Sequence, residues 1–304
     1  MEGLPNFYGI GAQKAGTSWL YENIKLLPDF RLLPIKELHY FDRDPKYSSR
    51  SDLTKTYLSD RFNRNYAKKI IKTLIKSDNY HELSFYFKWF FGNYNDKWYE
   101  SLYLKNSFFT GEITPSYSFL NIDDIKRMYA INPDAKLILL LRNPIERAWS
   151  HYKYQSRNKK KITIENEDPS KIIKFMNSDG QLLRSNYSRT IKNFTSVFTE
   201  QQLIIGFFDA IEDLPAQLIT DIINFIGSDK TVQDVQKKCS LNKKVNVSKK
   251  TKIPDDVLNH LLEMYEEPII KLSQYYGSYF KLWKYQYYGG LEPNNEELEP
   301  TITI

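Results

Sequence analysis

The sequence predicts an α/β fold in which a mostly parallel sheet is covered on both faces by helices. Short apolar runs bounded by turn residues recur along the chain, as is typical of buried strands. Segments with apolar residues at helical spacing alternate with these runs, as in sheets whose crossovers are helices. A glycine-bearing turn joins the first run directly to a helical segment. The four runs cover residues 7–10, 108–112, 136–142 and 203–208.

Composition favours one large domain. The 304 residues are 41% hydrophobic, which is enough for a sizeable core. We expect a single domain over residues 1–288. The segment 289–304 is acidic and rich in Pro and Asn, so we expect it to be a disordered tail.

The single cysteine, Cys239, excludes an internal disulfide and a cysteine-rich metal site. No apolar run approaches the roughly 18 residues of a membrane helix, and the first strand begins too early for a signal peptide. We therefore expect a cytoplasmic protein with no membrane partner. A lumenal enzyme trimmed to its catalytic domain has the same composition.

The formal charge of +6 favours anionic partners. No zinc finger, RNA-recognition signature or heptad pattern accompanies this charge, so we expect no nucleic-acid partner. The sequence also contains no metal-ligand cluster, so we expect no metal.

Further elements follow from local signals. Asn143 caps a helix with Pro144 at its first position and Glu146 three residues after the cap. Pro28 ends the first helix, and residues 28–42 are expected to be extended or loop-like. Other helices are expected over residues 61–76, 122–131, 144–157, 171–184, 187–198, 211–227 and 254–276, with helical or irregular structure over 79–104.

The turn after the first strand has the composition of a phosphate-binding loop. Turn amides and a helix N-terminus attract an anion, Lys14 adds a full positive charge, and Thr17 and Ser18 add hydroxyl donors. A Walker A loop is excluded because Lys14 precedes Gly16 instead of following it. A dinucleotide fingerprint is excluded because Lys14 occupies the position of its third glycine.

The remaining pattern, K-x-G-T-S at the start of a helix, resembles the loop that binds the 5'-phosphosulfate in sulfotransferases. These enzymes use 3'-phosphoadenosine 5'-phosphosulfate (PAPS). A second motif, Leu141 to Tyr152, resembles the 3'-phosphate site of the same family, R-N-P-x-x-R-A-x-S-x-Y, with every fixed position filled. Arg142 is suited to clamp a phosphate, and Ser150 lies two turns into the following helix.

A third segment, Lys36 to Arg43, resembles the E-x-H-F-F-D segment of glycosaminoglycan-type sulfotransferases, in which the Glu is the catalytic base. The resemblance makes Glu37 the base, since a carboxylate can accept the acceptor's proton. His39 projects from the same side of an extended segment and is the other candidate. Lys249 and Lys250 lie where relatives place a basic loop over the nucleotide.

The resemblance covers residues 6–283 and includes heparan sulfate-type domains and their bacterial relatives. It implies a P-loop-like, three-layer fold with about five strands, related to nucleotide kinases. The implied function is sulfuryl transfer from PAPS to a hydroxyl or amine of an acceptor, with a saccharide as a candidate. The donor would be held by Lys14, Arg142, Ser150, Lys249, Lys250 and the loop residues Ala15, Gly16, Thr17 and Ser18.

Two alternatives stay open at this point: a nucleotide kinase, and a glycan-binding module without catalysis. The residues leave open the identity of the acceptor, O- against N-sulfation, the oligomeric state and the choice between Glu37 and His39 as base.

Overall fold

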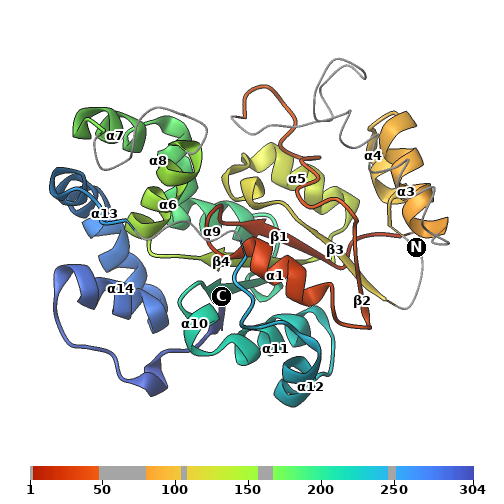
Figure 1. The fold of residues 1–304 in the computed structure, drawn as a ribbon. Helices are drawn as coiled ribbons and strands as arrows, with labels where there is room; N and C mark the ends of the chain where they lie inside the picture. The colour runs from red at the N-terminus through yellow and green to blue at the C-terminus, as the bar shows by residue number, and fades with distance from the viewer. Residues whose placement is uncertain (1–2, 48–79, 104–107, 157–166, 246–250) are drawn as a thin grey trace.

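The computed structural model describes residues 3–47, 80–103, 108–156, 167–245 and 251–304. At its centre lies a six-stranded sheet with the order β2-β3-β1-β4-β5-β6 (Figure 1). The strands are β1 (Phe7–Gly11), β2 (Phe30–Leu32), β3 (Phe109–Ile113), β4 (Lys136–Leu141), β5 (Leu203–Phe207) and β6 (Thr301–Thr303). Every neighbouring pair is parallel except β5 and β6. The expected mostly parallel sheet is confirmed.

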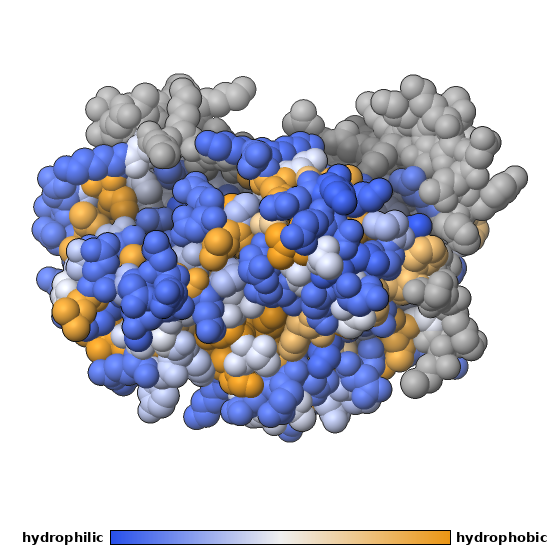
Figure 2. Space-filling view, turned by 90° about the horizontal axis from the view of Figure 1, so that it is seen from below, coloured by the Kyte–Doolittle hydropathy of each residue, from blue (hydrophilic) through white to orange (hydrophobic). Residues whose placement is uncertain are grey.

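Helices cover both faces of this sheet. In Figure 1, α5 lies above the sheet and α11 lies below it. Helix α5 packs beside α9, and α11 packs beside α1. Seen from below, the surface of the molecule is mostly polar, and its hydrophobic residues form small separate groups (Figure 2). None of the helices in the described ranges is long and apolar enough to cross a membrane.

The helices begin and end close to the expected residues where the sequence carries a cap. The side chain of Asn143 accepts a hydrogen bond from the amide of Ile145 (3.0 Å) at the start of α6. The α-helices are α1 (Thr17–Ile24), α3 (Tyr80–Phe91), α4 (Asp96–Ser101), α5 (Ile122–Ile131), α6 (Pro144–Ser156), α7 (Pro169–Met176), α8 (Asp179–Ser185), α9 (Tyr187–Thr195), α10 (Ala210–Asp213), α11 (Pro215–Ile226), α12 (Val232–Lys238), α13 (Asp255–Tyr276) and α14 (Ser278–Tyr288). Short 3₁₀ helices are η2 (Pro115–Phe119), η4 (Glu200–Gln202) and η5 (Asn295–Glu297).

The expected helix over residues 61–76 lies outside the described residues. The sequence did not predict the edge strand β2 or the helices α12 and α14. The single helix expected over residues 171–184 is wrong, because the chain forms two helices there, α7 and α8. Helix α12 begins with a capping box in which Thr231 and Asp234 exchange hydrogen bonds.

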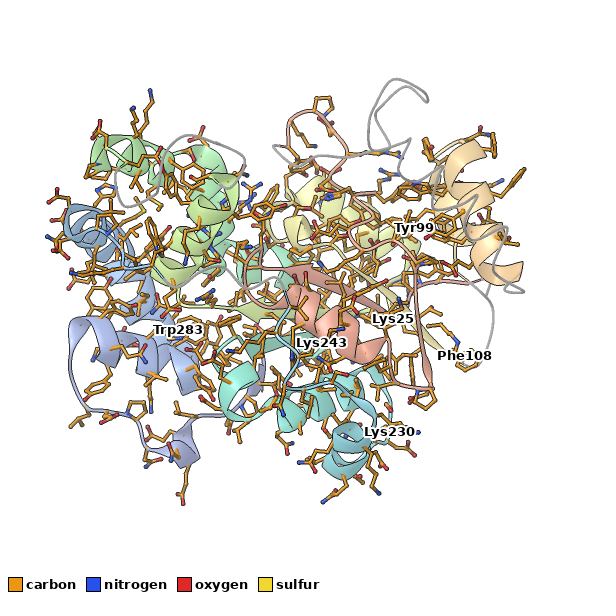
Figure 3. All side chains as sticks on the ribbon, in the orientation of Figure 1. Lys25, Tyr99, Phe108, Lys230, Lys243 and Trp283 are labelled. Atoms are coloured by element: carbon orange, nitrogen blue, oxygen red, sulfur yellow. The ribbon has the colours of Figure 1, made fainter. Side chains whose placement is uncertain are left out.

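The expected disorder of the C-terminal tail is wrong for residues 301–303, which form β6. The amide of Phe207 donates to the carbonyl of Pro300 (3.2 Å), and the amide of Ile304 donates to that of Leu203 (3.4 Å). The prediction followed the acidic composition of the tail. It is wrong here because the β-branched residues at the end of the tail form backbone hydrogen bonds with the open edge of β5. Nearby, Trp283 of α14 donates from Nε1 to Asp209 Oδ2 (3.1 Å) and fixes α14 (Figure 3).

Candidate active site

The loop between β1 and α1 is attached to the centre of the sheet. The amide of Ala12 donates to the carbonyl of Leu140 in β4. Lys14 and Gly16 have positive φ values of 72° and 88°, which turn the chain sharply into α1. The first turn of α1 holds no acidic residue, so its amides present an uncompensated positive end. The loop therefore has the backbone of an anion-binding site.

Two aromatic rings connect this loop to α6 and the end of β4. The ammonium of Lys14 lies 4.6 Å from the ring centroid of Tyr154, and the guanidinium of Arg142 lies 4.2 Å from that of Phe208. Phe208 also packs against Gly16, since a Cβ built at Gly16 would lie 3.2 Å from the Phe208 ring. Phe208 thus contacts both halves of the predicted donor site, and the sequence carried no signal for this role.

Arg142 is held at the end of β4 by its neighbours. Its Nη2 lies 2.9 Å from Glu146 Oε2, and its carbonyl accepts a hydrogen bond from the hydroxyl of Tyr187 (2.6 Å). Ser150 is buried on α6, one turn before Tyr154. The structure therefore brings Lys14, Gly16 and Arg142 to one edge of the sheet, with Ser150 on the helix that Lys14 contacts.

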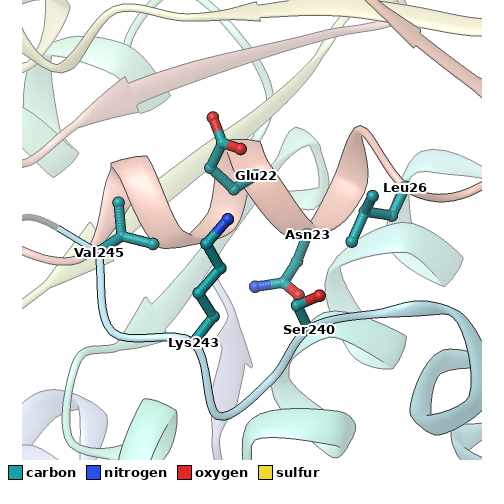
Figure 4. A pocket seen from close by; sticks show the side chains of 6 residues that line it. All are labelled: Glu22, Asn23, Leu26, Ser240, Lys243 and Val245. Carbon is teal, nitrogen blue, oxygen red and sulfur yellow. The ribbon is translucent and has the colours of Figure 1, made fainter.

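Lys249 and Lys250 lie outside the described residues, but the chain on either side of them is anchored. Before them, Trp19 Nε1 of α1 donates to the carbonyl of Leu241 (3.0 Å). After them, Trp149 Nε1 of α6 donates to the carbonyl of Thr251 (3.1 Å). A small pocket marks the first attachment, where Lys243 and its neighbours face α1 (Figure 4). The described chain is therefore attached to α1 before this gap and to α6 after it.

A second group of residues surrounds His39. The imidazole Nε2 lies 3.4 Å from Glu37 Oε2, and Nδ1 lies 2.8 Å from Asp42 Oδ2. The Ser116 hydroxyl donates to Asp42 Oδ2 and lies 3.2 Å from His39 Nδ1. Lys36 approaches Glu37 from the other side at 3.0 Å. The Glu and His predicted from the sequence are thus in contact, and Asp42 and Ser116 are site residues that the predicted set lacked.

These contacts determine the charges of the pair. Burial works to lower the pKa of His39, but hydrogen bonds to Asp42 and Glu37 outweigh it and raise the pKa to about 10. Burial works to raise the pKa of Glu37, but the hydrogen bond to His39 and the charge of Lys36 lower it to about 2. The imidazole is therefore a protonated donor at neutral pH, and the Glu37 carboxylate, with 37% of its side chain exposed, is the open acceptor.

A cluster of buried cations lies between α6 and α8. Arg147 is fully buried and donates from Nε and Nη2 to the Ser185 hydroxyl (3.0 and 2.7 Å). The Arg184 guanidinium lies 4.6 Å from the ring centroid of Phe119. Burial, followed by the charges of Arg147, Arg184 and Lys14, lowers the pKa of His151 to about 3. The cluster adds positive potential behind α6, and sequence reasoning did not single it out.

Within the described residues, no group of three or more His, Cys, Asp or Glu side chains is placed to hold a metal ion. The predicted donor loop, Arg142 and the Glu37–His39 pair all lie at the carboxyl ends of parallel strands or in the segments that follow them. Ligands of open α/β sheets bind at this edge.

The fold belongs to the P-loop-like α/β class. Residues 9–267 match the sulfotransferase domain, and the chain therefore belongs to the sulfotransferase family. A crystal structure of a sulfotransferase from Alicyclobacillus acidocaldarius has the same fold, with a TM-score of 0.62 at 21% identity, covering 92% of this chain and 99% of that one.

Two human proteins are similar in sequence. Carbohydrate sulfotransferase 15 is 27% identical over 241 residues, which cover 66% of this chain and 40% of the relative. Heparan sulfate glucosamine 3-O-sulfotransferase 6 is 30% identical over 151 residues, covering 49% of this chain and 30% of the relative. The matched regions span less than half the length of these relatives.

Proposed function

We propose that the protein transfers a sulfuryl group from PAPS to a hydroxyl or amine of a carbohydrate. The observation that carries this proposal is the contact of one ring, Phe208, with both Gly16 of the loop and Arg142. A nucleotide with phosphate groups at both its 5' and 3' positions would engage the two sides of this ring together. The names of the similar human proteins support the carbohydrate acceptor.

In the proposed reaction, an acceptor oxygen or nitrogen attacks the sulfur as the bond from sulfur to the bridging phosphate oxygen breaks. Lys14 and the amides of Ala15 to Ser18 neutralise the charge that grows on the leaving phosphate. Arg142 and Ser150 hold the 3'-phosphate, and Lys249 and Lys250 stay candidates for binding the nucleotide. The acceptor's proton goes to a carboxylate at the same edge.

Between the two candidate bases, the charges favour Glu37. Because His39 holds its proton to a pKa of about 10, it cannot accept another near neutral pH. The low pKa of Glu37 makes it a weak base. A weak base is sufficient if the acceptor atom loses its proton late in the reaction, because the new bond to sulfur makes that proton more acidic. His39, oriented by Asp42, then stabilises the charged carboxylate. The cytoplasmic location and the domain boundary at residue 288 stay predictions.

The test is transfer of label from PAPS carrying sulfur-35 to unsulfated chondroitin and to desulfated heparan. Glu37→Gln keeps the size of the side chain and removes its basicity, so we expect turnover to fall by about 10²- to 10⁴-fold. Glu22→Gln, an exposed position on α1, is the matched control and should keep full turnover. Binding of the polysaccharides without binding of the nucleotide would instead indicate a glycan-binding module.

A further inference from the structure

Glu112, at the end of β3, is a buried carboxyl group that the proposed reaction does not use. Its exposed fraction is 2%, and it forms no salt bridge with any residue in the described part of the chain. Three hydroxyl groups donate to it instead, those of Tyr99, Thr114 (2.9 Å) and Tyr117 (3.2 Å). A buried carboxyl group without a charged partner is costly to ionise, so its retention at this position needs a physical explanation.

Two of the three hydroxyl groups also accept hydrogen bonds from backbone amides of a single segment. The amide of Leu38 donates to Thr114 Oγ1 (3.0 Å), and the amide of Tyr40 donates to the Tyr117 hydroxyl (3.0 Å). Each hydroxyl has one hydrogen, and a backbone amide can only donate. Both hydroxyl hydrogens are therefore directed at Glu112, which must act as an acceptor for both.

The segment held in this way is residues 37–40, which we call the base segment. Glu37 and His39 have φ values of 67° and 56°, in the left-handed region that non-glycine residues avoid. Such backbone persists only where its surroundings impose it. The two held amides belong to Leu38 and Tyr40, so they alternate with the two residues in the left-handed conformation.

We propose that Glu112 is a positioning residue that fixes the base segment through Thr114 and Tyr117, and so keeps the Glu37 carboxylate against the His39 imidazole. Its effect on turnover rests on the proposed function, but its effect on the Glu37–His39 contact does not. Leucine in its place would remove the acceptor from both hydroxyls, whereas glutamine could keep an oxygen for Thr114 and Tyr117 with its NH₂ turned toward Tyr99.

The readout is the pKa of His39, followed by NMR in the full chain with isotope-labelled histidine. The sequence has four histidines, and the His39→Asn variant assigns the signal. The test variants are Glu112→Leu, Thr114→Val and Tyr117→Phe. Tyr99→Phe is the matched control, because it removes a hydroxyl that donates to the same carboxylate but holds no amide of the base segment.

We expect each test variant to lower the pKa of His39 by about one unit or more, because the contact with Glu37 loosens. Tyr99→Phe should leave it unchanged. Turnover should fall by about tenfold or more in the test variants, while the affinity for 3'-phosphoadenosine 5'-phosphate stays within about twofold.

Loss of thermal stability in the test variants with an unchanged pKa of His39 would show that Glu112 only supports the fold, and would overturn the proposal. An equal shift in Tyr99→Phe would do the same, because it would assign the effect to the whole cluster. If the wild type binds no nucleotide, the proposed function fails, but the titration of His39 still decides the role of Glu112.

Discussion

Replacing Gly16 with Ala should damage both the stability of the fold and the donor site. Gly16 has a φ of 88°, and an added Cβ would lie 2.3 Å from Ile211 Cδ1 and 3.2 Å from the Phe208 ring. The left-handed backbone costs an alanine about 1–2 kcal/mol. The overlap adds about 1–3 kcal/mol, since ordinary contacts between carbon atoms begin at about 3.5 Å.

We therefore expect the free energy of unfolding to fall by about 2–5 kcal/mol, measured by urea denaturation. Phe208 also stacks on Arg142, so its displacement should weaken binding of 3'-phosphoadenosine 5'-phosphate by about tenfold or more, measured by calorimetry. Relief of the clash by rotation of Ile211 would place the loss of stability at the lower end of this range.

Gly227→Ala is the matched control. Gly227 has a φ of 121° at the end of α11, and its added Cβ would meet only the Phe109 ring, at 3.3 Å. It should cost about 1–2 kcal/mol, the cost of the positive φ alone, and leave nucleotide binding unchanged. The reasoning is refuted if Gly16→Ala is no less stable than Gly227→Ala and binds the nucleotide as the wild type does.

Three further predictions concern other parts of the molecule. Arg142→Lys should weaken nucleotide binding about tenfold, measured by calorimetry, because lysine lacks the planar fork; an unchanged affinity would contradict this role. Burial raises the pKa of Glu112 from 4.5 to about 7, so its contribution to stability is present below pH 4.5 and lost as the pH rises through 7. Urea denaturation at pH 5 and pH 8 should show a decline of about 2–3 kcal/mol that Glu112→Gln lacks, and equal declines would exclude this group. Deleting residues 299–304 removes β6 and should lower Tm by a few degrees with nucleotide binding unchanged, whereas an unchanged Tm would show that β6 adds no stability.

The central fold could be predicted because its signals are local. The run over residues 136–142 is apolar from Leu137 to Leu141, since β4 is covered on both faces. The cap at Asn143 places the start of α6. In contrast, β2 and β6 are three-residue edge strands, and pairing with a neighbour defines them more than their own composition does.

The candidate site could be predicted where one short motif carries it, as for Lys14 and Arg142. The surroundings of His39 could not, because Ser116 lies 77 residues away along the chain and meets it only in the folded structure. Phe208 was missed for a similar reason, since nothing local distinguishes it from the apolar residues of β5 that precede it. The choice of base also required the structure, because it depends on which carboxylates contact the imidazole.

Lys14 and Arg142 are proposed to bind the 5' and 3' ends of a single nucleotide. Calorimetric titration of 3'-phosphoadenosine 5'-phosphate into the wild type, Lys14→Ala and Arg142→Ala tests this proposal most directly, with ATP as the competing ligand. We predict binding to the wild type that each substitution weakens, and much poorer binding of ATP. No binding to a folded wild type, or tighter binding of ATP, would contradict the account.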